Sequence, residues 1–126
     1  FFLNALLNIF KSTKEKPYDG LISRYTAFIM LNHYQAHNGM FIKTSKDEQI
    51  TPFKRESIID YIRYSANSVM ARNLLILYKM RRDEFFLNAF RQQLYNIAPQ
   101  IIGTGPLMVG WALQMLNYIS NRSDFD

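Results

Sequence analysis

The chain has 126 residues, with 15 Lys and Arg against 10 Asp and Glu, and it contains no cysteine. This length fits a single domain, and 48% hydrophobic against 20% charged residues excludes a disordered chain. The lack of cysteine excludes a disulfide framework, a thiolate nucleophile and a sulfur-ligated metal centre. The hydrophobic periodicity along the chain predicts an all-α fold, with one basic domain over residues 1–126 that forms a compact bundle of five or six helices.

The start and the residue usage of the chain bear on its origin. It begins Phe1-Phe2 without Met, so we expect a processed protein or a piece of a longer one, and no basic segment precedes the apolar start as in a secretory signal. Ile, Asn, Phe and Tyr are frequent while Gly and Pro are scarce, a bias common in AT-rich genomes. This association favours a phage or mobile-element accessory protein in the host cytoplasm or the virion.

Residues 1–12 predict a helix with one narrow polar stripe, formed by Asn4, Asn8 and Lys11. The rest of this helix is apolar, so it must be covered on most sides. We expect it to dock on a partner protein or a second copy, and the alternative is the surface of a membrane. The predicted protein-interface residues are Phe1, Phe2, Leu3, Leu6, Leu7 and Phe10.

A second helix is predicted after a polar loop over residues 12–19. Asp19 is suited to be its N-cap, and Gly39 supplies a stop because glycine adopts the left-handed conformation at low cost. The stripe expected to face inward consists of Leu21, Tyr25, Phe28, Ile29 and Asn32, with Leu31 alongside.

Thr51-Pro52 is the clearest helix start in the chain, because Thr caps free amides and Pro fits the first helical position. A further helix is expected to start at or near Ser68 and to end at Arg81-Arg82, since cations suit a helix C-terminus. Asp83 can cap the helix after it. One long helix over residues 68–96 is the alternative.

The last third of the chain predicts two helices separated by a loop. Pro99 and residues 103–106 predict that loop, and the final helix is expected from Leu107 to about Asn121. The residues expected inside are Phe86, Phe90 and Leu94 in the first of these helices, and Met108, Trp111, Met115 and Ile119 in the second.

The positive charge is concentrated in the middle of the chain. Between Tyr61 and Arg82 there are five cations and no acid, which equals the net charge of +5 of the whole chain. A localised basic surface attracts phosphates because it releases their condensed counterions. We predict nucleic-acid binding through the surface of residues 61–82, and the alternative is a solvated helix face. The predicted nucleic-acid-binding residues are Arg63, Asn67, Ser68, Arg72, Lys79, Arg81 and Arg82.

The same segment resembles the helix-turn-helix of many bacterial and phage DNA-binding domains. Residues 55–62 would be the first helix, 63–65 the turn and 66–79 the second helix, with Ser65 and Val69 at the positions of the usual serine and packing valine. The resemblance implies that the major groove is faced by Asn67, Ser68, Ala71 and Arg72.

The segment departs from that pattern at two points. Arg63 stands in the turn, where Gly is usual, and Leu74 to Leu77 make the second helix apolar nearly all round, as a buried helix would be. A plain helical hairpin is therefore the alternative. The second functional hypothesis is a structural or adaptor subunit of a virion or complex, which acts through apolar helix–helix contacts and is compatible with the first.

Motifs for chemistry are weak, so no enzyme and no cofactor are expected. His33 and His37 have the spacing of two metal ligands on a helix, but a hydrolytic zinc site needs a Glu where the chain has Tyr34. Residues 103–106 lack the Lys-Ser/Thr of a phosphate loop. Residues 92–121 are uncharged, but two prolines interrupt them and the longest unbroken piece is too short to span a membrane.

Overall fold

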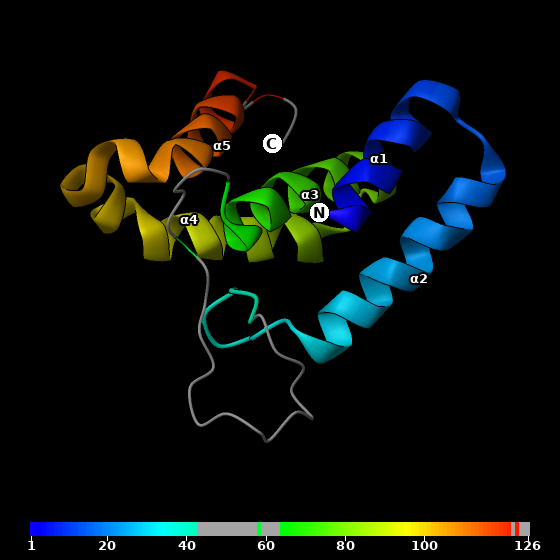
Figure 1. The fold of residues 1–126 in the computed structure, drawn as a ribbon, viewed down its shortest axis with the longest axis horizontal. Coiled ribbons are helices and arrows are strands. Elements are labelled where there is room, and N and C mark those ends of the chain that lie inside the picture. Colours follow the sequence, from blue (N-terminus) through cyan, green and yellow to red (C-terminus); the bar gives the residue numbers. More distant parts are fainter. Residues whose placement is uncertain (43–57, 59–63, 122, 124–126) are drawn as a thin grey trace.

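The computed structural model describes residues 1–42, 58, 64–121 and 123. Within these residues α3 lies at the centre, with α1, α4 and α5 packed against it, and α2 runs along the outside against α1 (Figure 1). The prediction of an all-α helical bundle is confirmed. The described residues hold five α-helices, the lower of the two numbers predicted, and the helix predicted from Thr51 lies outside them. The elements are α1 (Phe2–Thr13), α2 (Lys16–Asn32), α3 (Ala66–Arg81), α4 (Glu84–Thr104), the 3-10 helix η1 (Gly105–Met108) and α5 (Val109–Ser120).

The central helix α3 has ten buried residues among its 16. Ser65 caps its start, where the side-chain oxygen accepts a hydrogen bond from the Ser68 backbone N–H at 3.1 Å, so the helix begins at Ala66 and not at Ser68. Arg82 ends it in the left-handed conformation (φ 54°). Asp83 then caps α4 by accepting from the Phe85 N–H at 2.9 Å. The alternative of one helix over residues 68–96 is therefore wrong.

The segment after α2 is a tight turn that is tied to the start of α3. Gly39 sits in it with φ 72°, and Tyr34 and Phe41 form an isolated antiparallel bridge across it. The buried amide of Asn67 pairs with the backbone of Phe41 in both directions, accepting from its N–H at 2.7 Å and donating to its carbonyl at 2.9 Å. The side chain of Asn67 thus makes the two hydrogen bonds with Phe41 that a neighbouring β-strand would otherwise make.

Two predicted helix boundaries are wrong because of prolines. Helix α2 begins at Lys16, since Pro17 fits its first turn, and Asp19 lies inside that turn and is not the N-cap. Helix α4 continues through Pro99 to Thr104, where a loop was predicted. Pro99 deprives the Tyr95 carbonyl of its helical donor, but both residues are exposed, so water can solvate that carbonyl.

The inward faces of α2 and α5 were also predicted wrongly in part. In α2 the residues with less than a tenth of their surface exposed are Ile22 and Thr26, while the predicted stripe of Leu21, Tyr25 and Phe28 faces solvent. In α5 Trp111 is fully buried as predicted, but Ile119 is 63% exposed. Both helices are apolar on more than one side, so periodicity alone could not choose the side that faces the core.

The pairing of Asn67 with Phe41 predicts a large loss of stability when it is removed. Asn67→Leu leaves a buried N–H and a buried carbonyl of Phe41 without partners, which costs about 1–3 kcal/mol for each group. We expect the free energy of unfolding in urea to fall by about 2–6 kcal/mol. Asn88→Leu on the exposed side of α4 is the matched control and should change it little. Equal losses in the two variants would contradict this role of Asn67.

A second buried amide predicts the opposite result. Gln93 is fully buried in α4, and within the described residues neither end of its side-chain amide has a hydrogen-bond partner. Gln93→Met removes both unpaired groups at similar volume, so we expect a gain of about 1 kcal/mol and a melting midpoint raised by roughly 2–8 °C. The neighbouring Gln92 donates to the His37 carbonyl at 3.1 Å, so Gln92→Met should not stabilise the protein. A drop in the midpoint for Gln93→Met, measured by circular dichroism, would refute this assignment.

Candidate functional site: a cationic groove

A groove of about 570 Å³ lies where the end of α1, the start of α2 and the last turns of α3 meet. Cations from α1 and α3 and from the residue after α1 line it together with half-buried apolar side chains and one carboxylate. The lining residues are Phe10, Lys11, Lys14, Asp19, Ile76, Lys79, Met80 and Arg81. Among the described residues, four positive charges and one negative charge therefore line this groove at neutral pH.

Local structure places three of these cations near helix ends. Lys11 is in the last turn of α1, and Lys14 follows that helix in the left-handed conformation (φ 59°), with its ammonium 5.7 Å from the centre of the Phe10 ring. Lys79 is in the last turn of α3. The negative end of a helix dipole stabilises such cations, which explains why each of them lies at a helix end. The dipole does not explain why the ends of α1 and α3 meet at one groove.

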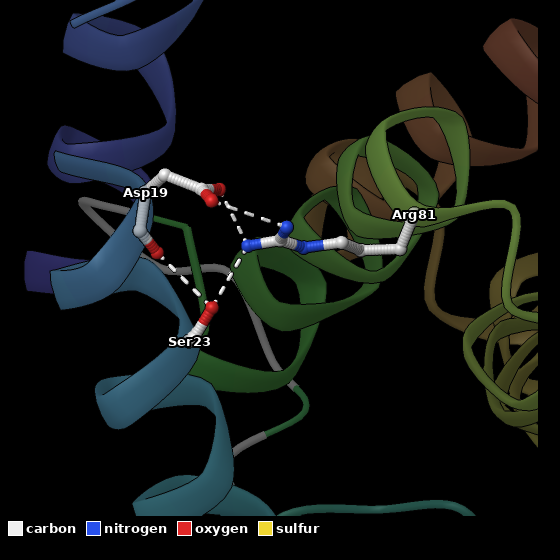
Figure 2. Close-up of polar contacts among 3 residues, drawn as sticks. All are labelled: Asp19, Ser23 and Arg81. Atoms are coloured by element: carbon white, nitrogen blue, oxygen red, sulfur yellow. Dashed lines mark hydrogen bonds and ion pairs between the residues drawn. The ribbon is translucent and has the colours of Figure 1, made fainter. Parts of the chain in front are cut away.

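Arg81 joins α3 to α2 through the one carboxylate of the groove (Figure 2). Its guanidinium donates to both oxygens of Asp19, at 2.5 and 3.4 Å, and to the hydroxyl of Ser23 at 2.8 Å. The Ser23 hydroxyl donates in turn to the Asp19 backbone carbonyl at 3.0 Å. Arg81 and Asp19 are each more than a third exposed, so this fork orients α2 more than it stabilises the fold.

The predicted cations of residues 61–82 do not all gather at this groove. Lys79 and Arg81 line it, whereas Arg72 borders a smaller hollow of about 140 Å³ with residues of α1 and α5. Arg82 lies over the Tyr78 ring, 5.8 Å from its centre. Arg63 falls outside the described residues.

The predicted helix-turn-helix is wrong in its second helix, whose side chains were expected to face the major groove. Most of its first helix and the first residue of its turn, residues 55–57 and 59–63, lie outside the described residues. Asn67 and Ala71 are fully buried and Ser68 is 2% exposed, so these side chains cannot enter a major groove. The reason is that α3 packs against three other helices and is not a surface helix. Of the residues assigned to base contact, Arg72 alone is exposed.

The protein interface predicted on α1 is also wrong for its three leucines, which are not available to a partner. Leu3, Leu6 and Leu7 belong to the core, because this side of α1 packs against the rest of the bundle. Phe10 is half-buried at the groove. Phe1 and Phe2 remain exposed, and Phe2 meets the ring of Tyr25 edge-on at 4.8 Å between centroids.

Sequence reasoning missed three charged residues of the groove, Lys11, Lys14 and Asp19, and two apolar ones, Ile76 and Met80. The three charged residues lie more than 55 residues from Lys79 in the chain, and no local pattern shows that they meet it. The signal that was available is the density of lysines directly after the first helix, which was interpreted as a loop.

The two histidines do not form the pair that their spacing suggested. Helix α2 ends at Asn32, so His33 and His37 do not share a helix face. The Nδ1 atom of His33 lies 3.1 Å from the Ile42 carbonyl oxygen. Within the described residues no group of three His, Cys, Asp or Glu side chains is placed to hold a metal ion, and no helix has the length and apolarity to cross a membrane.

Comparisons with protein-family models, with curated proteins and with solved structures give no match to this chain.

Proposed function

We propose that this chain is a non-enzymatic binding module that holds the phosphate backbone of a nucleic acid in the cationic groove. The observation that carries the proposal is the meeting of Lys11 and Lys14 with Lys79 and Arg81 around one open groove. Asp19 is engaged by Arg81, so the lysines supply the excess charge that a polyanion would neutralise. Binding of this kind gains its free energy from the release of counterions.

The lining of the groove also fits a sugar-phosphate chain. Phe10, Ile76 and Met80 place apolar surface between the cations, against which a base or sugar can pack. Asn67 and Ser68 are buried, so α3 offers no row of polar side chains for base edges. The proposed binding is therefore independent of sequence.

The outward side of α3 indicates the direction in which a bound strand would leave the groove. Arg72 and Lys79 are seven residues apart, which puts them on one face of the helix about 10 Å from each other along its axis. Ile76, which lines the groove, lies between them. A bound strand that leaves the groove along this face would next meet Arg72.

Neutralising one lysine should weaken binding and flatten its salt dependence. We expect Lys79→Gln to lower affinity for a fluorescent oligodeoxythymidine and to reduce the slope of log K against log salt by about 0.7. Arg24→Gln is the matched control, because Arg24 is exposed on α2 and does not line the groove. Fluorescence anisotropy over a salt series measures both. No binding at low salt, or equal losses in the two variants, would rule out the groove as the site.

Removing the one carboxylate should have the opposite effect. Asp19→Asn takes away the negative charge of the groove and releases the Arg81 guanidinium for a phosphate, so we expect tighter binding in the same assay. The cost to folding should be below about 1 kcal/mol because the ion pair is partly exposed. Glu84→Asn, at an acid that does not line the groove, is the control for net charge. Unchanged affinity for Asp19→Asn would contradict the electrostatic argument.

A second candidate function is that of an adaptor in a protein assembly, and exposed apolar surface favours it. Soluble monomers seldom expose large contiguous apolar patches. Here α2 and α5 each present a row of exposed apolar side chains to solvent, although both helices also pack on the bundle. These rows are Leu21, Tyr25, Phe28 and Leu31 on α2, and Val109, Leu113, Leu116 and Ile119 on α5.

A further inference from the structure

The outer face of α2 is an apolar stripe that the other described elements leave largely exposed. We define the α2 stripe as Leu21, Tyr25, Phe28 and Leu31, whose spacing of four, three and three residues keeps them on one side of a helix. Phe28 is 56% exposed and Leu31 is 74% exposed. The stripe is about 15 Å long, which is the length of three turns of a helix.

The position of α2 explains why the stripe is left open. Among the described elements it packs closely on α1, and its inner side buries Ile22 and Thr26. Edge-on contact with Phe2 holds the Tyr25 ring, and the Phe28 ring lies 5.8 Å from the His33 ring. Aromatic side chains held in place in this way lose little rotational freedom when a partner covers them, which makes them effective anchors.

One cation, Arg24, lies directly beside the stripe. Arg24 lines a hollow of about 430 Å³ together with Leu21, Tyr25 and Phe28, and no hydrogen bond or ion pair of Arg24 occurs within the described part of the chain. The other charged residues of α2 are Lys16 and Asp19, and Asp19 is held by Arg81. Among the described residues, the stripe therefore presents apolar anchors beside a cation that no carboxylate pairs with.

We infer that the α2 stripe binds an acidic amphipathic helix of another protein. An apolar row of this length and spacing is complementary to the apolar side of one helix, as in other helix-in-groove contacts. A carboxylate flanking the apolar side of that helix would pair with Arg24 at the rim. This inference rests on the second candidate function and is independent of the cationic groove.

Charge argues against a second copy of this chain as the occupant. Pairing of two α2 helices would bring Lys16 and Arg24 of one copy against a helix whose one carboxylate, Asp19, is already engaged with Arg81. The Arg24 guanidinium of each copy would then face an α2 helix that offers it no unengaged carboxylate of its own, and like charges at an interface disfavour the wrong complex.

The test uses three synthetic amphipathic helical peptides that share a leucine row and differ in their flanking residues, which are Glu, Gln or Lys. We expect the Glu peptide to bind the whole chain most tightly by fluorescence anisotropy. Phe28→Asp should weaken that binding about tenfold or more. Arg24→Glu should weaken it about fivefold and shift the preference to the Lys peptide. Circular dichroism should show both variants folded, since both side chains are exposed.

Ile102→Asp is the matched control, because Ile102 is 90% exposed on α4 and lies outside both exposed apolar rows. An equal loss in this variant would overturn the inference. If Phe28→Asp abolishes binding but the Gln and Lys peptides bind as well as the Glu peptide, the acidic partner is wrong while the adaptor function stands. If no peptide binds, or if the chain dimerises through Phe28 in sedimentation, a foreign acidic helix is not the occupant. Self-association of that kind would still leave the adaptor function in place.

Discussion

The burial of α3 is the constraint on which the rest of the structure depends. A helix covered on nearly all sides cannot leave polar groups without partners, because an unpaired buried group costs more free energy than a hydrogen bond returns. Asn67 satisfies this requirement through the backbone of Phe41, and Asn73 accepts from the Asn4 side chain at 2.8 Å. These two amides tie the 33–42 turn and α1 to the central helix. The cations of α3 are left to its outward face and its C-terminal end, and that placement creates the cationic groove.

One side of helix α2 attaches it to the bundle, and the other side carries the exposed apolar stripe. Its inner side carries Ile22 and Thr26, which are buried, together with Asp19 and Ser23, which the Arg81 guanidinium holds in place. Its outer side carries the α2 stripe. Because side chains three or four residues apart share a face, the residues that orient the helix are not those of the stripe. Variants of the groove lysines therefore leave the side chains of the stripe in place, whereas a variant of Asp19 or Arg81 also loosens the hold on α2.

The sequence was sufficient for features that depend on local chemistry and insufficient for those that depend on packing. The cap at Asp83 and the burial of Phe90 and Trp111 followed from residue type and period. The buried side of α2 did not, because that helix is apolar on both sides and only its contact with α1 decides which side is covered. The burial of Asn67 and Ser68 could not be predicted from a helix-turn-helix spacing, since their partners lie in the Phe41 backbone and at the Ser65 cap. The meeting of Lys11 and Lys14 with Lys79 in one groove could not be predicted either, because only the packing of α1 against α3 brings them together.

The distribution of charge connects the two proposed surfaces. The described residues include nine Lys and Arg against four Asp and Glu, and Arg81 engages one of those four acids. An excess of this kind raises the rate of encounter with any anionic partner, but it does not select among them. Selection requires shape, and here the two surfaces differ. The cationic groove is a hollow rimmed by cations, which suits a flexible phosphate chain, whereas the α2 stripe is a row of aromatic and aliphatic side chains with Arg24 beside it, which suits a helix. A chain with both could join a nucleic acid to an acidic protein without either ligand displacing the other.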